Sequence, residues 1–550
     1  MLISRGAAMR RRGASRKGAC HGAVLLAIAM LCGCAGLPPG ADYPKPASAA
    51  FAHPEDTRLG REFADAAREH GRDSAFRIIN AGVDGFQLRM QMIDAAQSAL
   101  DLQYFIFRGD ETGRMLTDGL QRAADRGVRI RVLVDDGDRV AGDEQILRLL
   151  ANPSVEVRIF NPSSYRGHSR LVRRLNFLLN APRLNYRMHN KLLVADGALA
   201  LIGGRNIGNQ YFQVDPESQF ADDDVVTAGP IVGELSATFD EFWNSDLAIP
   251  AQALGRGARP DRGVTARTEH QSAGREAPGA APKSAAIDYA SLLKSGEPLA
   301  GIASGRLPMA WAHARVVYDS PDKKQVSGGA LPGRLITRAV LESIREVQSE
   351  LVLVSPYFIP AADELQLLKD LRRRQVRVRV LTNSLESTTE IAAQSGYEHY
   401  RVPLLRDGVE LYEVRSMLGD VRGSGQTAQV SRFGNYALHA KMYVFDRQKV
   451  FIGSMNYDQR SKRINTEVGL IIESTELAQQ TARRFDAMVK PDDCYIVGLR
   501  PAEPPGNSSR LVWRTEENGH AVEYTHEPAR SGWQRLEVKL LALLPLDKQL

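Results

Sequence analysis

Apolar and polar positions follow two periods that alternate along the chain. The stretch "VDGFQLRMQMIDAAQSA" has helical spacing behind a cap at Asp84, and the stretch "LDLQYFIF" after it has the composition of a strand. A second helical stretch, "TGRMLTDGLQRAADRG", ends on Gly127 and leads into the strand "VRIRVLVDD". Strands that alternate with helices favour a largely parallel sheet with helices on its faces. The pattern therefore predicts an α/β fold.

This pattern occurs twice. "QSALDLQYFIF" (97–107) recurs as "QSELVLVSPYFIP" (348–360), and "GVRIRVLVDD" (127–136) recurs as "QVRVRVLTNS" (375–384). Self-similarity of this kind indicates two related halves. We expect a first lobe at 75–249 and a second lobe at 311–490.

The remaining segments have other compositions. Residues 250–310 include a stretch rich in Gly, Ala, Pro and Arg without hydrophobic periodicity, which predicts a linker or loop. Residues 34–74 precede the first lobe. Residues 491–550 form a C-terminal tail in which Asn518-Gly519 marks a hairpin turn, and we expect this tail to pack on the second half.

The first 33 residues have the pattern of a secretory signal peptide. They carry six basic residues and no acid, followed by the apolar run Ala23 to Leu31 and then small residues. That run is shorter than the roughly 20 residues of a membrane-spanning helix. Without this segment, 65 basic residues face 65 acidic ones, so the sequence pI of about 9.0 is mostly a targeting feature. A neutral mature chain does not favour a nucleic-acid partner.

The positions of the cysteines also indicate a protein that is exported from the cytoplasm. Leu31-Cys32-Gly33-Cys34 resembles the lipobox of bacterial lipoproteins, which implies that Cys34 carries the lipid anchor. We therefore expect a bacterial envelope protein that faces the periplasm, on either the inner or the outer membrane. Only Cys494 lies in the folded part, so no disulfide framework is available, and no Cys/His cluster has metal-binding spacing.

A polar motif is repeated in matched places of the two halves. "HNKLLVADGALALIGGRN" begins at His189 and "HAKMYVFDRQKVFIGSMN" begins at His439, and both read H-x-K-x4-D-x6-G-[GS]-x-N. Residues i and i+2 of a strand point to one face, so Lys191 projects with His189, and Lys441 with His439. Each half thus presents an imidazole and an ammonium group in one direction.

These residue types suit the cleavage of a phosphodiester. The reaction needs a nucleophile for phosphorus, a proton for the departing oxygen and positive charge for the other oxygens. The two His-Lys pairs, with Asn206 and Asn456 as further phosphate ligands, supply all three, so we expect no metal and no cofactor. Gly204 and Ser454 lie where the backbone passes near a phosphate, although small residues at a tight turn explain them equally well.

The motif aspartates have two interpretations. Asp196 precedes Gly197 where one strand must turn into the next, and Asp446 precedes Arg447 in the same place of the second half. Asp196 and Asp446 therefore count as members of the catalytic motif, but a hairpin role explains them as well, and we prefer the structural role.

With its paired HKD motifs, the chain resembles the phospholipase D superfamily, and within it the bacterial cardiolipin synthases and phospholipase D-like lipid enzymes. The resemblance covers about residues 75 to 490. It implies two duplicated α/β/α sandwich lobes with mixed, largely parallel sheets and one active site where the lobes meet. It also implies a covalent phosphohistidine, and we expect His189 as the nucleophile and His439 as the acid/base.

The resemblance further implies that acidic residues orient the two histidines. Asp224, with Asp222 as the other choice, and Glu467 lie at comparable distances downstream of the two motifs. A nucleophilic imidazole needs such an acceptor on its second nitrogen, because the acceptor fixes the tautomer.

The implied function is a phosphatidyltransferase acting on phospholipids, and a cardiolipin synthase in particular. The alternatives are a hydrolase that releases phosphatidic acid, an endonuclease of the same superfamily and a noncatalytic lipoprotein. Residues 169–187 combine five arginines with the apolar residues Leu171, Phe177, Leu178 and Leu179 just ahead of the first motif. They suit a phospholipid entrance, or an amphipathic helix packed on its own lobe.

Overall fold

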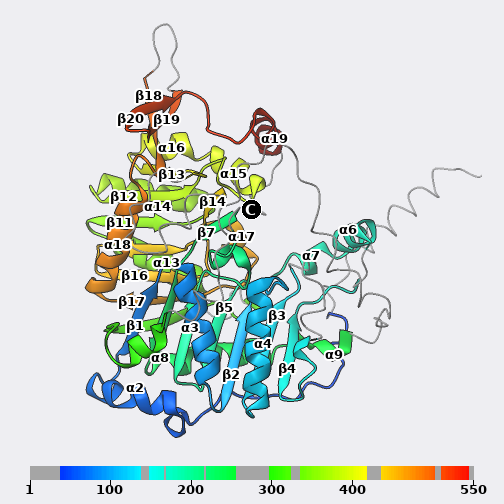
Figure 1. The fold of residues 1–550 in the computed structure, drawn as a ribbon. Coiled ribbons are helices and arrows are strands. Elements are labelled where there is room, and N and C mark those ends of the chain that lie inside the picture. The colour runs from blue at the N-terminus through cyan, green and yellow to red at the C-terminus, as the bar shows by residue number, and fades with distance from the viewer. Residues whose placement is uncertain are drawn as a thin grey trace, which may run out of the picture.

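The computed structural model describes residues 38–137, 148–165, 169–215, 218–254, 296–323, 335–417, 435–501 and 510–543. The predicted signal peptide, the predicted anchor Cys34 and most of the predicted linker at 250–310 lie outside these residues. Within them, the chain forms two lobes built around one continuous sheet (Figure 1).

The first lobe has a mixed sheet covered by helices. Helices α3 and α4 lie on one face and α8 on the other (Figure 1). In spatial order the strands are β9 (Ala248–Pro250), β4 (Val155–Phe160), β3 (Arg129–Asp135), β2 (Ala99–Tyr104), β5 (Lys191–Ala195), β6 (Leu199–Gly203), β8 (Asp224–Ala228) and β1 (Ser74–Ile79). The helices of this lobe and its connections are η1 (Pro54–Asp56), α2 (Arg58–Glu69), α3 (Gly82–Ala95), α4 (Glu111–Asp125), α6 (Arg170–Leu179), α7 (Ala181–Leu184), η2 (Asn209–Tyr211), α8 (Ile231–Trp243), α9 (Ala251–Leu254) and α11 (Pro298–Ala303).

The second lobe repeats this arrangement. In spatial order its strands are β10 (Ala310–Tyr318), β17 (Val468–Glu473), β16 (Lys449–Gly453), β15 (Met442–Phe445), β11 (Glu350–Val354), β12 (Arg377–Asn383), β13 (Glu410–Val414), β18 (Cys494–Arg500), β19 (Arg510–Glu517) and β20 (His520–Tyr524). Its helices are α13 (Ile336–Glu346), α14 (Ala362–Arg373), α15 (Ile391–Glu398), α16 (Arg401–Arg406), α17 (Gln459–Arg463), α18 (Thr475–Met488) and α19 (Gly532–Ala542). The strands β18 to β20 of the tail extend the sheet, and their hairpin turns at Asn518-Gly519, both with positive φ.

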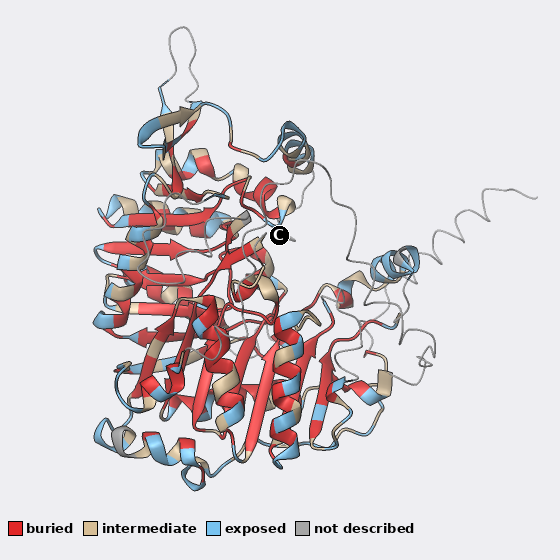
Figure 2. Cartoon of the chain, in the orientation of Figure 1, coloured by how far each residue is buried: buried red, intermediate tan, exposed pale blue. Residues whose placement is uncertain are grey.

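The two lobes share hydrogen bonds and a core. Strand β10 pairs with β1 of the first lobe at 310–312 and with β17 of the second at 313–318, so the sheet runs through both lobes. One apolar cluster contains residues of α8, α18 and strands of both lobes, while two further clusters lie under α3 and α4 and under α13 and α14 (Figure 2). The interior of the molecule is therefore continuous across the repeat.

Two details differ from the prediction. The α/β fold and its mixed sheets are confirmed, but antiparallel neighbours outnumber parallel ones among the described strands. In the main sheet, as far as it is described, only the neighbours in β2-β3-β4 and β11-β12-β13 run parallel. The return strands after each motif are joined by tight hairpins, and a hairpin can only be antiparallel. Helix α3 begins at Gly82 rather than behind Asp84, since Ala81 is already extended and Asp84 lies in the first turn.

Candidate active site

The two His-Lys pairs lie at the starts of equivalent strands. His189 precedes β5, whose first residue is Lys191, and His439 and Lys441 precede β15. Both histidines are more than 90% buried, and both lysines are almost completely buried. Nζ of Lys191 donates to the carbonyl oxygen of His189 at 2.5 Å, and Nζ of Lys441 donates to the carbonyl of His439.

The loops that carry the histidines form backbone pairings with the opposite lobe. Met188 forms a parallel bridge with Thr466, and the short strand β14 (Asn435–Leu438) pairs in parallel with β7 (Ser218–Ala221). In both cases the residue before a histidine pairs with the residue before an acid of the other lobe. The duplicated chain thus brings each motif against its repeat.

These pairings bring each histidine into contact with a carboxylate of the other lobe. Nδ1 of His189 lies 2.8 Å from Oε2 of Glu467, and Nδ1 of His439 lies 2.5 Å from Oδ2 of Asp222. Each imidazole is therefore oriented by an acid of the other lobe. With Nδ1 occupied, Nε2 of each ring is the nitrogen left for chemistry.

The predicted orienting residue Asp224 has a different position, and the alternative Asp222 contacts His439. Asp224 accepts hydrogen bonds from Arg89 at 2.8 Å and Arg205 at 3.2 Å inside the first lobe. Strand register explains the shift: Gly203 pairs with Asp224 and Gly453 pairs with Gly469. In each half, the acid that orients a histidine lies two residues before the strand partner of the motif glycine. Counting back from Asp224 gives Asp222, and counting back from Gly469 gives Glu467.

Burial and mutual repulsion favour neutral bases in this site. Desolvation lowers the pKa of His189 well below its ordinary value, and the charges of Lys191 and Lys441 lower it further. Desolvation and then Lys441 lower the pKa of His439 to about 3, against the opposing effect of Asp222. Because Lys441 acts on His189 and Lys191 acts on His439, the two pairs share one electrostatic environment. Neutral imidazoles at pH 7 are ready to accept protons or attack phosphorus.

The other charged groups of the site are also perturbed. Burial raises the pKa of Glu467 to about 7, although Lys191 and the Ser454 hydroxyl oppose the shift. Burial opposes ionisation of Asp222 as well, but His439 and Lys441 hold its pKa below the usual range. Burial lowers the pKa of Lys441 to about 8 and that of Lys191 well below its ordinary value. Strong shifts of this kind gather at functional sites.

Two of the predicted phosphate ligands have side-chain partners in the protein. Asn206 accepts from the amide of Ile106 and donates to the Tyr211 hydroxyl, at 3.1 and 2.9 Å. Ser454 donates to Oε2 of Glu467 at 2.5 Å, so it supports the acid that orients His189.

Gly204 and Asn456 complete the set. A Cβ on Gly204 would lie 2.1 Å from Oδ1 of Asp222, so a glycine is required for the carboxylate to reach His439. Asn456 is buried, and its Oδ1 has no hydrogen-bond partner among the described residues.

The motif aspartates lie at the far ends of their strands. Asp196 accepts from the amides of residues 97–99 at 2.8 to 2.9 Å. Asp446 accepts from the amides of residues 348–350 at 2.7 to 3.0 Å and from the Ser349 hydroxyl. Both have positive φ in their hairpins. These contacts support the structural interpretation of the two residues.

Aromatic rings that the motif does not contain line the histidines. Phe220 stacks on His439 with ring centroids 5.1 Å apart, and Tyr211 meets the same ring edge-on at 5.2 Å. Phe105 meets His189 at 5.0 Å. These rings exclude water from the imidazoles and thereby explain part of their desolvation. Phe105 lies in the repeated stretch 97–107, where Phe358 is its counterpart, whereas only their place in the fold identifies Tyr211 and Phe220.

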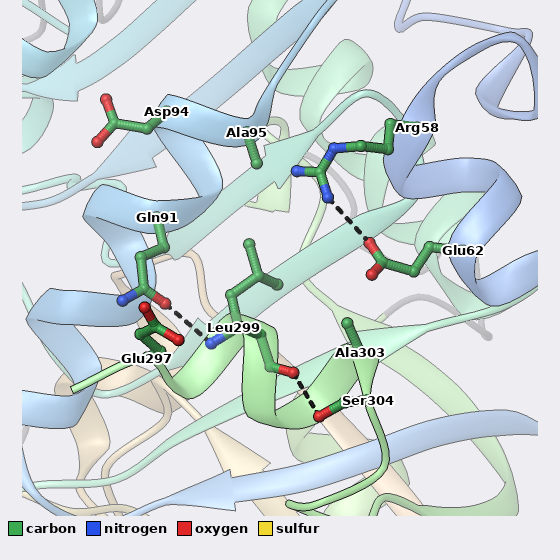
Figure 3. Close-up of a pocket in the computed structure, with 10 residues that line it drawn as sticks. Arg58, Glu62, Gln91, Asp94, Ala95, Glu297, Leu299, Ala303 and Ser304 are labelled. Atoms are coloured by element: carbon green, nitrogen blue, oxygen red, sulfur yellow. Dashed lines mark hydrogen bonds and ion pairs between the residues drawn. The ribbon is translucent and has the colours of Figure 1, made fainter.

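Three further findings concern the described part of the chain. A pocket of about 550 Å³ lies between α2, α3 and α11 and is lined by Arg58, Glu62 and Gln91, with neither histidine among its lining residues (Figure 3). Among the described residues, no group of three His, Cys, Asp or Glu side chains is arranged to hold a metal ion. In the same residues, no helix has the length and apolar character needed to cross a membrane.

Comparison with known proteins gives consistent matches. A family model described as "Cardiolipin synthase, PLD-like domain" matches residues 90–243 and 340–489. Cardiolipin synthase C of Escherichia coli K12 is 33% identical over 497 residues, which cover 89% of this chain and 99% of that protein. The major cardiolipin synthase ClsA of Bacillus subtilis 168 is 25% identical, covering 75% of this chain and 68% of its own. The fold is similar to that of a phosphatidylserine synthase of Haemophilus influenzae, with a TM-score of 0.51, 12% identity, and coverage of 89% of this chain and 100% of the other.

Proposed function

Because the chain belongs to the PLD-like family of cardiolipin synthases, we propose that it is a phosphatidyltransferase that makes cardiolipin from two phospholipid molecules through a covalent phosphohistidine. The observation that carries this proposal is the crossed pair of contacts, His189 with Glu467 and His439 with Asp222. It leaves two Nε2 atoms, backed by two ammonium groups, available to a single phosphodiester.

In the first step, Nε2 of His189 attacks the phosphorus atom of the donor lipid. The bond from phosphorus to the headgroup oxygen breaks, and His439 gives its Nε2 proton to that oxygen, so an alcohol leaves. Glu467 accepts a hydrogen bond from the Nδ1–H group of His189. This contact stabilises the positive charge that develops on the ring. Bound phosphate supplies the negative charge that raises the pKa of His439 and lets it carry a proton.

In the second step, His439 takes a proton from the hydroxyl group of an acceptor lipid. The resulting oxygen attacks phosphorus, the bond from phosphorus to His189 breaks, and the phosphatidyl group has moved to the acceptor. Lys191 and Lys441 neutralise the phosphate oxygens in both steps. One phosphodiester is exchanged for another, so no external energy source is required.

Lipid mass spectrometry on producing cells tests the reaction. Cells with the wild-type chain are expected to accumulate cardiolipin, and cells with His189→Ala or His439→Ala are not. Phosphatidic acid that rises instead of cardiolipin would identify a hydrolase, with water as the acceptor. No change in either lipid, despite folded protein, would reject the proposed function.

The roles of the two histidines can be separated with an activated substrate. The ionised Asp222 suits His439 for carrying a proton, since it stabilises an imidazolium. A phosphodiester with a nitrophenol leaving group needs no proton donor, so His439→Ala is expected to form and retain the phosphohistidine, whereas His189→Ala forms none. Detection of the modified peptide around residue 189 by mass spectrometry supports the assignment, and modification at residue 439 would reverse it.

The cell location follows from the proposed anchor. Cys34 would carry the lipid, and the folded lobes would lie on the periplasmic side of a bacterial membrane. Labelling with a fatty-acid analogue is expected to mark the wild-type chain and to fail with Cys34→Ser. A label that persists in this variant would rule out Cys34 as the anchor.

A further inference from the structure

Among the described residues, the strongly exposed large apolar side chains lie on two helices and at two further positions. Within the described part of the chain, every large apolar residue that is strongly exposed belongs to α6, to α19 with the adjoining Leu543, or is Met417. On α6 these are Leu171, Val172, Leu175, Phe177, Leu178 and Leu179. On α19 they include Trp533, Leu536 and Leu540. A concentration of exposed apolar surface marks a place of interaction.

Helices α6 and α19 lie on the same side of the molecule (Figure 1), where α19 packs against α15, and Figure 2 shows the exposed surfaces of both helices. No residue of α6 belongs to any of the three apolar cores. A helix of ten residues is marginal in water without tertiary packing. An apolar phase that receives its leucines would stabilise it.

Helix α6 is anchored to the end of β3, beside the first histidine. Its Asn176 donates to the Ser163 hydroxyl at 2.8 Å, and the Ser163 amide donates to Asp136 at 2.7 Å. The preceding residue, Asp135, accepts from the amide of Met188 at 2.9 Å. The helix is therefore connected by short contacts to the residue just before His189.

Helix α19 is anchored to the equivalent place in the second lobe. Gln534 donates to the carbonyl of Leu385 at 2.7 Å, just after the end of β12. At that end Asn383 accepts from the amide of Leu438 at 2.8 Å, one residue before His439. Because β3 and β12 are repeat mates, the two helices project from matching edges of the active site.

Charge identifies the partner. Residues 169–187 contain five arginines and no acid; Arg187 is buried against Asp135, whereas Arg173 and Arg174 are exposed on α6 itself. Arginine and leucine together suit an anionic phospholipid surface. A contact between two copies of α6 would place these arginines against their own copies, and their repulsion opposes it.

We propose that α6 and α19 form a docking surface that inserts its leucines into an anionic phospholipid leaflet and holds the active-site opening against it. The proposal rests on the proposed function for the direction in which substrate arrives. The docking itself is a separate property and can be measured without turnover.

Trp533 provides an intrinsic probe. The full chain, with its anchor, is placed on phosphatidylglycerol vesicles whose acyl chains do or do not carry bromine, which quenches tryptophan on contact. We expect the brominated lipid to quench the fluorescence of the wild-type chain. The substitution Trp533→Phe is expected to abolish this quenching, and Phe177→Trp added to that variant is expected to restore it. Gln479→Trp in the same background is the control, because it is exposed on α18 at the opposite side of the molecule (Figure 1). It is expected to show no quenching.

Three results would overturn the proposal. Equal emission with and without bromine would place the helices in water, with the chain held only by its amino terminus. Equal quenching of the Gln479→Trp probe would show unspecific adsorption. A blue shift of Trp533 emission that grows with protein concentration and ignores lipid would mean that the helices contact a second copy of the chain.

Activity gives a second readout. Leu178→Glu and Leu540→Glu are each expected to raise the KM for vesicle lipid about tenfold, because each removes the transfer of one leucine into hydrocarbon. Gln479→Glu adds the same charge on α18 and is expected to leave KM unchanged. If the wild-type protein shows the quenching but changes neither cardiolipin nor phosphatidic acid, docking stands and only the proposed function fails.

Discussion

Replacement of Glu467 by glutamine tests the crossed arrangement most directly. Glu467 and His189 come from different lobes, lie 2.8 Å apart and are buried. Glutamine keeps the size of the side chain and removes its charge. A hydrogen bond to a charged group contributes about 1.5 kcal/mol more than a neutral one. We therefore expect Glu467→Gln to lower kcat about tenfold.

The variant also predicts a change in pH dependence. The pKa of Glu467 is raised to about 7, so the carboxylate becomes protonated as the pH falls through that value. The wild-type rate is expected to decline below pH 7, while His189 stays neutral because its pKa lies far lower. In Glu467→Gln this decline should be absent.

The assay is the conversion of phosphatidylglycerol to cardiolipin by purified protein between pH 5 and 9. Glu473→Gln is the matched control, because it makes the same substitution at the exposed far end of β17, the strand that follows Glu467. It is expected to leave both rate and pH profile unchanged. The reasoning is refuted if Glu467→Gln has a rate within twofold of the wild type and still loses activity below pH 7.

Three further predictions concern the surroundings of the site. Gly204→Ala is expected to lower kcat at least tenfold at an unchanged melting temperature, since its Cβ would displace Asp222; normal turnover would contradict this. Asp196→Ala should lower the free energy of unfolding by about 3 kcal/mol, because it leaves buried amides unpaired, as measured by denaturant titration. The pKa of Lys441 is about 8, so activity should fall as the pH rises through 8, and Lys441→Arg should shift that fall to higher pH. An unshifted fall would assign it to another group.

The repeat made much of this architecture predictable. Two copies of the same motif in two copies of the same α/β pattern indicated that the His189 and His439 segments are equivalent, and the shared fold places them together. The positions of Asp196 and Asp446 at hairpins also followed from local turn chemistry. These features depend on short-range sequence patterns, which a single chain displays.

The remaining features depend on contacts between distant residues. Asp222 and Asp224 are almost indistinguishable in sequence, and only the register of β6 with β8 decides which carboxylate reaches His439. The aromatic ring of Phe220 reaches the same histidine through the β7–β14 pairing. The predominance of antiparallel pairs also follows from the order of strands in space, which hydrophobic periodicity does not report.

The pairing of β1 with β10 restricts how this protein can handle water. Enzymes that undergo domain closure expel solvent from the active site by moving one domain against another. Here such a movement would break the backbone hydrogen bonds between β1 and β10, so we expect the two lobes to keep a fixed distance during the proposed reaction. In the proposed reaction, water must then be excluded by the bound lipids, whose acyl chains would fill the opening of the site. We therefore expect the bound lipid, rather than a domain movement, to decide whether an alcohol or a water molecule completes the proposed exchange.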